Sequence, residues 1–174
     1  VFCHQDNLNT DGIYPGKYTY DENIPPEKQA QVAMENYDPE FGKRVQQGNI
    51  LVGGFNFGTG SSREQAATCL KYKGIPILIA GSYSETYKRN ATNNGFLTIE
   101  VPALVNYLKN QFGTKELTCV TAIDASVDFE NSVITLQKDG NTKQFSFLPL
   151  GKVAQELILR GGLEQWVVHN LQKQ

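Results

Sequence analysis

Cysteine and histidine are scarce in this sequence, which has three cysteines and two histidines among 174 residues. Cys3, Cys69 and Cys119 lie far apart, and no C-x-x-C pair occurs. Structural zinc sites and self-contained iron–sulfur sites use closely spaced cysteines, so neither is predicted within this chain. The odd number of cysteines favours an intracellular, reducing compartment over a disulfide framework.

A large excess of charge and a long hydrophobic run are missing as well. The formal net charge of −2 gives no basic surface for nucleic acid or a membrane, and no apolar run approaches the length of a transmembrane helix. We therefore expect neither nucleic acid nor a membrane as a partner. The length predicts a single domain, residues 1–174, that can bury a core without disulfides. The sequence begins at Val1, and we expect it to be part of a longer chain or complex.

The most informative segment is a glycine loop, N-F-G-T-G-S-S-R-E at residues 56–64, between a strand-like run and a helix-like run. Glycines in such a place let the backbone turn tightly and bring N–H groups close to a ligand. The start of the next helix adds unpaired N–H donors and the positive end of its dipole, which favours anions. Because Ser61, Ser62 and Arg63 fall in that expected first turn, the loop predicts a carboxylate or phosphate site with hydroxyl chemistry.

Other interpretations of the glycine loop stay open on residue chemistry alone. Ser61 and Glu64 fit a capping box, in which both side chains satisfy backbone donors, although this leaves Arg63 unexplained. A non-catalytic anion-binding module fits the same residues. His4 and Asp11 with Ser61 would make a serine-hydrolase triad, but the serine does not lie in a G-x-S-x-G elbow. The loop also lacks the G-K-[ST] of a nucleotide P-loop and the third glycine of a dinucleotide fingerprint.

A second polar segment, N-L-N-T-D-G-I-Y-P, occupies residues 7–15. Asn, Thr and Asp before Gly and Pro are ordinary turn formers, which explains most of this composition. A functional role requires Asp11 to reach the glycine loop in three dimensions.

The middle of the chain predicts a parallel β-α-β-α-β core with right-handed crossovers. Continuous apolar runs indicate strands that are covered on both faces. The expected strands are 50–54, 77–80 and 96–101, and the helices between them are 61–73 and 84–93. Flanking helices are expected at 25–36, 39–47 and 102–111.

After Gly113 the alternation of apolar and polar residues predicts an antiparallel meander, with Asp139-Gly140 as a hairpin turn. Its expected strands are 118–122, 126–129, 132–138 and 142–147, and closing helices follow at 152–160 and 163–171. The expected buried faces of these two helices comprise Val153, Leu157, Leu159, Leu163, Trp166, Val167 and Leu171.

Three segments resemble the signatures of the small, swivelling domain of the aconitase superfamily. They are N-F-G-T-G-S-S-R-E-Q-A-A at 56–67, N-T-D-G-I-Y-P-G-K-Y at 9–18, and I-A-G-S-Y-S-E-T-Y-K-R-N followed by N-N-G-F between 79 and 96. Within the superfamily, Gln65-Ala66-Ala67 and Tyr87-Lys88-Arg89-Asn90 most resemble the fungal homoaconitases, where this domain is the C-terminal part of one long chain. Isopropylmalate isomerases are the next most similar, and citrate-type aconitases are more distant.

The resemblance implies a layered β/β/α domain of the α/β class. It implies one domain of a hydro-lyase that dehydrates and rehydrates a hydroxy-tricarboxylic acid, converting homoaconitate to homoisocitrate in lysine biosynthesis. The small subunit of isopropylmalate isomerase, in leucine biosynthesis, is the alternative. The implied cofactor is a [4Fe–4S] cluster, held by a fused or separate partner portion, in which one iron acts as a Lewis acid on the substrate hydroxyl. The isolated domain is then expected to be inactive, and the implied location is the mitochondrial matrix.

The resemblance also implies roles for individual residues. Ser61 matches the base that removes a proton beside a carboxylate, and helix-end donors with Arg63 would favour its charged form. Asp11 matches the active-site aspartate that orients groups or relays protons. The resemblance implies Ser62 and Arg63 as ligands of the substrate carboxylates, and we expect Gly60 and Lys17 to bind the substrate as well. Lys17 departs from the citrate-type pattern, in which an arginine follows the aspartate, and we expect it to meet a distal carboxylate of the substrate.

Overall fold

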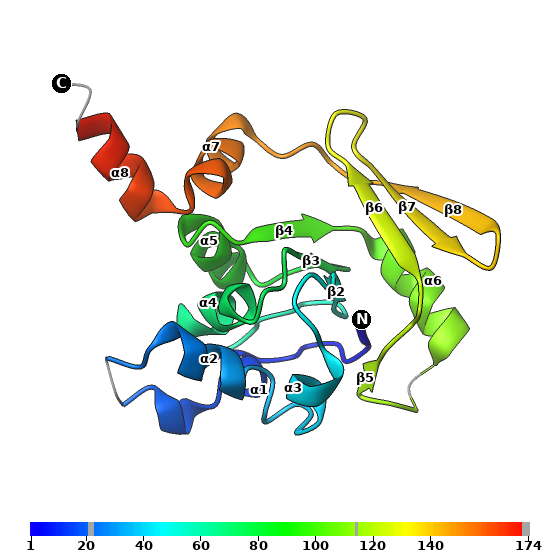
Figure 1. The fold of residues 1–174 in the computed structure, drawn as a ribbon, viewed down its shortest axis with the longest axis horizontal. Helices are drawn as coiled ribbons and strands as arrows, with labels where there is room; N and C mark the ends of the chain where they lie inside the picture. Colours follow the sequence, from blue (N-terminus) through cyan, green and yellow to red (C-terminus); the bar gives the residue numbers. More distant parts are fainter. Residues whose placement is uncertain (21–22, 114, 172–174) are drawn as a thin grey trace.

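The computed structural model describes residues 1–20, 23–113 and 115–171, and two sheets organise the fold (Figure 1). A five-stranded sheet has the order β4-β3-β2-β1-β5, and a three-stranded sheet has the order β6-β7-β8. The strands are β1 (Phe2–Cys3), β2 (Leu51–Val52), β3 (Ile77–Ala80), β4 (Leu97–Glu100), β5 (Thr118–Cys119), β6 (Asp124–Asp128), β7 (Val133–Lys138) and β8 (Asn141–Ser146). The α-helices are α1 (Thr10–Ile13), α2 (Pro26–Val32), α3 (Phe41–Arg44), α4 (Gln65–Tyr72), α5 (Glu85–Asn93), α6 (Pro102–Phe112), α7 (Lys152–Arg160) and α8 (Leu163–Leu171).

The predicted parallel core is confirmed. β1, β2, β3 and β4 pair in parallel, and Ile79 of β3 lies between Val52 of β2 and Ile99 of β4. All four residues of β3 are buried. This explains its continuous apolar sequence, since both faces of the strand are covered.

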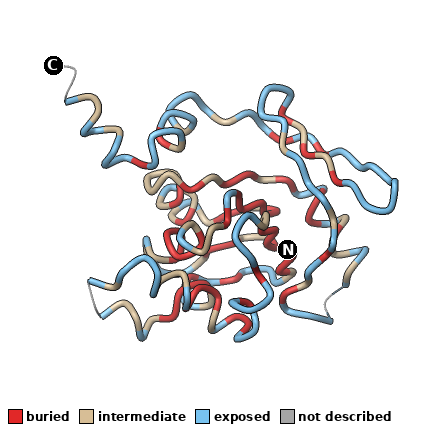
Figure 2. The backbone as a smooth tube through the Cα atoms, viewed as in Figure 1, coloured by how far each residue is buried: buried red, intermediate tan, exposed pale blue. Residues whose placement is uncertain are grey.

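The two faces of the five-stranded sheet pack into different cores, because successive side chains of a strand point to opposite sides. Leu78 and Ala80 belong to a core shared with helices α1 to α5. Ile77 and Ile79 belong to a second core shared with α6 and the three-stranded sheet. Figure 2 shows the buried strands between these layers. The predicted β/β/α layering of the α/β domain is thus confirmed.

The helices before β2 are shorter than predicted. α2 ends at Val32 rather than at Asn36 because Met34 adopts a left-handed conformation, with φ of 62°. The Met34 N–H leaves the helix and donates to the carbonyl of Ile13 at 2.7 Å. This bond ties the chain after α2 to the end of α1.

The antiparallel meander is confirmed for β6, β7 and β8, but not for its first expected strand. β5 pairs with β1 at the edge of the other sheet, and the left-handed residue Ala122 (φ 50°) separates it from the meander. Asp139 and Gly140 form the predicted hairpin turn with φ of 49° and 78°. Positive φ at both turn residues is the type I′ geometry that suits the strand twist.

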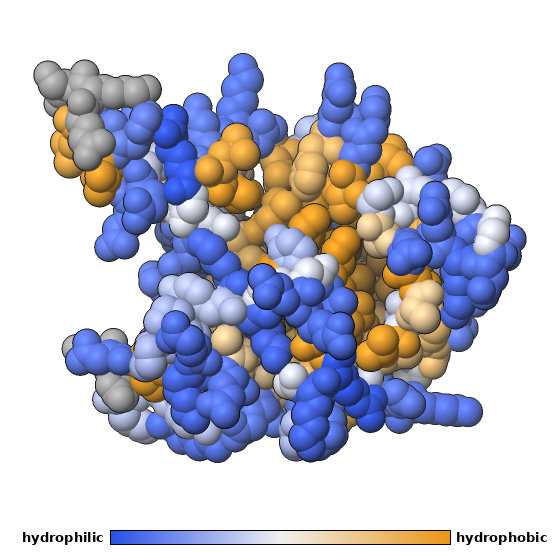
Figure 3. Space-filling view, viewed as in Figure 1, coloured by the Kyte–Doolittle hydropathy of each residue, from blue (hydrophilic) through white to orange (hydrophobic). Residues whose placement is uncertain are grey.

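The closing helices form where predicted, but the expectation that they bury apolar faces is wrong. Leu157 is buried, whereas Val153, Leu159 and Leu171 are 73%, 85% and 65% exposed. α8 projects from the body (Figure 1), and none of its described residues is buried. Apolar surface is visible between α7 and the meander in Figure 3, where a groove of about 450 Å³ lies. Among the described residues, no helix has both the length and the apolar character needed to cross a membrane.

Candidate active site

Three segments that are distant in sequence meet beyond the carboxyl ends of β2 and β3. The Gly58 N–H donates to the Leu8 carbonyl at 2.8 Å, and Thr10 N–H donates to the Thr59 carbonyl at 2.8 Å. Ser84 Oγ, which follows β3, donates to the Gly58 carbonyl at 2.6 Å. The polar segment 7–15 therefore lies directly beside the glycine loop. This edge of a parallel sheet is where α/β folds place their ligands.

The glycine loop has a backbone that only glycine can adopt at position 58. Gly58 has φ of 75°, and a Cβ atom there would overlap the ring of Tyr87. Tyr87 is buried on α5 and donates its hydroxyl to the carbonyl of Ala66 at 3.3 Å. Gly60 also has positive φ, at 98°. The loop is thus fixed against α5, which holds the residues that follow in one position.

The predicted helix start at Ser61 is wrong, because α4 begins at Gln65. Glu64 occupies the N-cap position without a side-chain cap, so the capping-box interpretation also fails. Ser61 Oγ instead bonds to Thr10 Oγ1 at 2.8 Å, and the Ser62 carbonyl accepts from Asn90 Nδ2 at 3.0 Å. These contacts hold the serines in an extended loop ahead of the helix.

The backbone donors of this loop are available for an anion. The N–H groups of residues 60–64 donate no hydrogen bond to any other described residue. Gly60, Ser61 and Ser62 are exposed, and Arg63 is half-buried. Successive free N–H groups beside a guanidinium attract a carboxylate or phosphate. The anion site predicted from the sequence is supported, with loop donors in place of a helix turn.

Asp11 and Arg63 form an ion pair across the two segments. Arg63 Nη1 donates to Asp11 Oδ1 at 2.9 Å, and Gly16 N–H donates to the same oxygen at 2.8 Å. Asn36 Nδ2 donates to Asp11 Oδ2 at 3.0 Å. The bonds from Arg63 and Gly16 lower the pKa of the Asp11 carboxyl below its ordinary value. Asp11 is therefore a carboxylate that orients Arg63.

The guanidinium of Arg63 keeps part of its donor set for a ligand. Its bonds to Asp11 and to the Tyr14 carbonyl (3.1 Å) both use Nη1. The side chain of Arg63 is 24% exposed and that of Asp11 is 52% exposed. A Cβ atom at Gly16 would lie 3.0 Å from Asp11 Oδ1 and 3.1 Å from Arg63 Nη2, so glycine permits this close approach.

Lys17 points to a different partner. Its Nζ lies 2.6 Å from Glu35 Oε1 and 4.8 Å from the centre of the Tyr18 ring. The hydrogen bond that Lys17 donates to Glu35 raises the pKa of the Lys17 ammonium. The structure brings together Asp11, Gly60, Ser61, Ser62 and Arg63, whereas it pairs Lys17 with Glu35.

The serine-hydrolase triad does not form among the described residues. Ser61 is bonded to Thr10, and Asp11 is bonded to Arg63, Gly16 and Asn36. No hydrogen bond connects His4 to either of them in the described part of the chain.

Sequence reasoning missed three residues that support the site. Thr10 precedes Asp11 directly, so its proximity could have been inferred from the motif. Asn90 lies in the third signature segment and fixes the Ser62 carbonyl. Asn36 had no sequence pattern to identify it, because its contact with Asp11 depends on how the chain folds back after α2.

The cysteines do not suit an iron–sulfur cluster. Cys3 and Cys69 are fully buried, and Cys119 is half-buried. Burial raises the pKa of the Cys3 thiol to about 12 and also raises that of Cys69. No group of three His, Cys, Asp or Glu side chains that could hold a metal ion occurs among the described residues.

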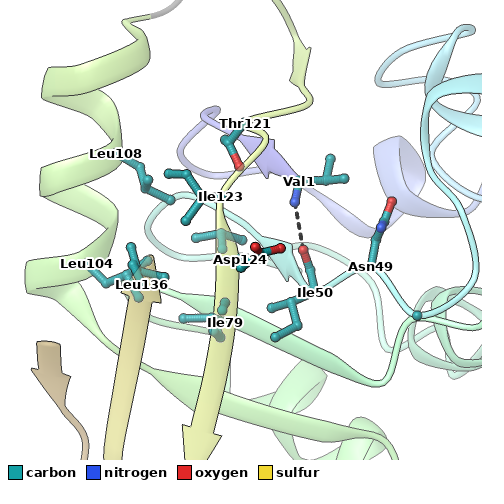
Figure 4. Close-up of a pocket in the computed structure, with 13 residues that line it drawn as sticks. Val1, Asn49, Ile50, Ile79, Leu104, Leu108, Thr121, Ile123, Asp124 and Leu136 are labelled. Carbon is teal, nitrogen blue, oxygen red and sulfur yellow. Dashed lines mark hydrogen bonds between the residues drawn. The ribbon is translucent and has the colours of Figure 1, made fainter. Parts of the chain in front are cut away.

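A separate cavity of about 250 Å³ lies between the meander, α6 and the five-stranded sheet (Figure 4). Ile79, Leu104, Leu108 and Leu136 form apolar parts of its wall. None of the predicted site residues lines it. The candidate site is therefore the group of exposed and half-buried residues at the carboxyl ends of the strands, which we call the loop cluster. It comprises Asp11, Gly60, Ser61, Ser62 and Arg63.

Comparisons with known proteins agree with this arrangement. The family model described as "Aconitase C-terminal domain" matches residues 2–104. Homoaconitase, mitochondrial, of Yarrowia lipolytica is 49% identical over 96% of this chain, and that of Emericella nidulans is 50% identical over 96% of it. The Candida parapsilosis protein of the same name is 44% identical over the whole chain.

These curated relatives are much longer than this chain, which spans 25%, 22% and 26% of their respective lengths. Among solved structures, 3-isopropylmalate dehydratase of Methanocaldococcus jannaschii matches with a TM-score of 0.79 and 29% identity. That match covers 96% of this chain and 90% of the solved chain. The solved chain is therefore of about the same size as this one.

Proposed function

The chain belongs to the aconitase C-terminal domain family, and from this premise we propose that it is the substrate-binding and base-supplying domain of an iron–sulfur hydro-lyase. Identities of 44% to 50% with homoaconitases, against 29% with the isopropylmalate dehydratase, favour homoaconitate and homoisocitrate as the substrates. The activity then belongs to lysine biosynthesis. These relatives are named as mitochondrial proteins, which favours the mitochondrial matrix as its location.

The observation that carries this proposal is the position of Ser61 beside free N–H donors and Arg63. A substrate carboxylate bound by the loop N–H groups, Ser62 and the free side of Arg63 would place its neighbouring carbon near Ser61 Oγ. Ser61 Oγ would take the proton from that carbon during dehydration and return it during rehydration. Asp11, held as a carboxylate, keeps Arg63 oriented and can relay protons with a group of the partner portion.

The residues of this chain do not fit a [4Fe–4S] cluster, because two of its three cysteines are buried and no described group of three His, Cys, Asp or Glu side chains could hold a metal ion. We assign the cluster to the remaining length of the enzyme, which in the relatives exceeds this chain about threefold. The partner is then the cluster-bearing portion, fused in the same chain or separate. The tricarboxylate would bind between that portion and the glycine loop.

The test is Ser61→Ala in the complete enzyme. Loss of a general base should lower kcat by about a hundredfold or more, with little change in KM. Arg63→Lys should raise KM by about tenfold, because a bidentate fork becomes a point charge. Ser126→Ala, an exposed serine of the meander, is the matched control. An unchanged kcat in Ser61→Ala would favour the non-catalytic anion-binding alternative.

A further inference from the structure

We propose that α7 and α8 form an apolar docking surface for the cluster-bearing portion of the enzyme. This inference rests on the proposed function, which assigns such a portion to the remaining length of the enzyme. The surface consists of exposed apolar side chains on two consecutive helices, and we call it the α7–α8 surface. Its members are Val153, Leu159, Leu163, Val167, Val168 and Leu171.

The apolar side chains of α8 follow a helical repeat. Leu163, Val167 and Leu171 are spaced by four residues, and Val168 lies three residues before Leu171, so all four share one side of the helix. They are between 41% and 65% exposed, and Figure 3 shows apolar side chains on this helix. An apolar stripe normally packs against another element, but no described residue of α8 is buried. Exposed apolar surface of this kind marks an interaction site.

The corner between α7 and α8 holds this stripe away from the body. Lys71 Nζ, on α4, donates to the Asn94 carbonyl at 2.7 Å and to the Gly161 carbonyl at 3.2 Å. A Cβ atom at Gly95 would lie 2.4 Å from the carbonyl carbon of Gly161, so the two backbones are in close contact. Folding α8 back onto its own domain would break these contacts. The helix is therefore held in a fixed direction in which its apolar side needs a partner.

The composition of α8 does not suit a membrane surface. Helices that lie on membranes carry Lys or Arg on their polar side. The sequence of α8, L-E-Q-W-V-V-H-N-L, contains neither. With nine residues the helix is also too short to cross a membrane. A protein surface is therefore the kind of partner that fits this stripe.

The homoaconitase relatives favour one protein partner over a second copy of this chain. They match 96% to 100% of this chain, α8 included, within single chains about four times as long. A portion linked in the same chain has an effective concentration on the order of millimolar, so it covers an apolar face before a second copy can. The occupant is therefore an apolar segment of the cluster-bearing portion, fused as in these relatives.

The α7–α8 surface and the loop cluster lie at opposite edges of the five-stranded sheet. The α7–α8 corner contacts Gly95, which precedes β4, whereas the loop cluster lies beyond the carboxyl ends of β2 and β3. These three strands are parallel, so their amino ends share one edge and their carboxyl ends share the other. Docking at the α7–α8 surface thus leaves the loop cluster free to bind substrate.

The experiment places the photoreactive residue benzoylphenylalanine at position 168 of the complete enzyme, with position 120 as the matched control. Val168 and Val120 are 50% and 57% exposed, and Val120 lies outside the α7–α8 surface, between β5 and β6. After irradiation, position 168 should form cross-links to peptides of the cluster-bearing portion, identified by mass spectrometry. These cross-links should be absent from position 120.

Three results would overturn this inference: no cross-link from position 168, cross-links only to residues 1–174, or the same cross-links from position 120. A product of twice the mass of the enzyme would instead assign the surface to a second copy. A second measurement is amide hydrogen exchange in the complete enzyme. Val168→Glu should raise the exchange rate of α8 amides by roughly tenfold or more, because a charge uncovers the helix, whereas Val120→Glu should not change it.

The outcome can be separated from that of the proposed function. Ser61 lies in the loop cluster, so Ser61→Ala should leave the cross-links from position 168 unchanged. An unchanged kcat in Ser61→Ala together with these cross-links would overturn the assignment of the base but not the docking surface. A lowered kcat without the cross-links would overturn the docking surface alone.

Discussion

Hydrogen bonds within the loop cluster favour the charged form of the Asp11 carboxyl. Asp11 accepts from Arg63, from the Gly16 N–H and from Asn36, and these bonds lower its pKa from the ordinary value of 3.8. A carboxylate with a lowered pKa stabilises the fold at a pH above its unfolded-state pKa. That stabilisation is lost as the pH falls through the lower, folded-state pKa.

Asp11→Asn should therefore lower the free energy of unfolding at about pH 6, and the difference from the wild type should shrink towards about pH 3. The effect should be small, because the pair is partly exposed and screened by solvent. Urea unfolding of both proteins at the two pH values measures it. A constant difference between the two proteins would show that the Asp11–Arg63 pair does not supply this pH dependence.

Lys17 is the predicted site residue whose side chain is paired outside the loop cluster, with Glu35. Its partner Glu35 and Lys17 itself are 36% and 58% exposed, and exposed ion pairs contribute little stability. A substrate carboxylate can therefore replace Glu35 at small cost. This keeps Lys17 as a proposed ligand for the distal carboxylate.

Lys17→Met in the complete enzyme should lower kcat/KM for homoaconitate several-fold more than for the shorter, apolar-armed isopropylmalate series. Lys43→Met is the control, because Lys43 of α3 also forms an exposed ion pair, with Glu40, and it is not a predicted site residue. If the ratio of kcat/KM for the two acids is the same in Lys17→Met as in the wild type, Lys17 is not a ligand of the distal carboxylate.

At the residue scale, the composition of the glycine loop predicted an anion site, and the family resemblance predicted Asp11 beside it. Neither predicted the hydrogen bond that Ser61 forms with Thr10. The S-x-x-E pattern predicted a cap, whereas tertiary contacts with Thr10 and Asn90 hold this segment out of the helix. Local propensity is a weak prior where side chains of other segments compete for the same groups.

At the scale of elements, the glycine loop depends on α5. Ser84 caps α5 by accepting from Tyr87 N–H at 3.3 Å and also donates to the Gly58 carbonyl at 2.6 Å. The ring of Tyr87 fills the space where a side chain at position 58 would lie. The position of the loop, and so of Ser61, is fixed by the packing of this helix.

Gly58→Ala should destabilise the chain by about 2 kcal/mol more than Gly140→Ala. Both positions have similar φ, at 75° and 78°, so both substitutions carry the left-handed strain. At Gly140 a Cβ atom meets nothing within 4 Å, whereas at Gly58 it overlaps Tyr87. Denaturant unfolding of the two variants separates the steric cost from the conformational cost. Equal losses would mean that Tyr87 moves aside.

Elements with strong local patterns were predictable to within one or two residues. β3, α5 and the hairpin at Asp139 follow from an apolar run, a serine cap and a two-residue turn. β5 was not predictable as part of the five-stranded sheet, because its pairing with β1 joins segments more than 100 residues apart. Likewise, periodicity marked the apolar sides of α7 and α8 but could not show whether anything covers them.

At the scale of the whole molecule, the chain has the parts of an independent domain, and we expect its loop cluster to be only part of an active site. Two cores lie on opposite faces of one sheet, and the matched isopropylmalate dehydratase chain is of similar size. A chain with its own core is expected to fold alone. The loop cluster, however, is open to solvent and has no metal ligands nearby among the described residues.

We therefore expect the isolated chain to unfold cooperatively but to show no hydro-lyase activity. After anaerobic treatment with iron and sulfide it should show no stable [4Fe–4S] absorption, because ligation requires deprotonated thiolates. Cys3 and Cys69 are buried, and burial raises the pKa of both thiols. The complete enzyme, treated in the same way, is the control and should acquire both the absorption and the activity. A stoichiometric cluster on the isolated chain would overturn the assignment of the cofactor to the partner portion. Activity without that portion would show that the loop cluster is a complete site.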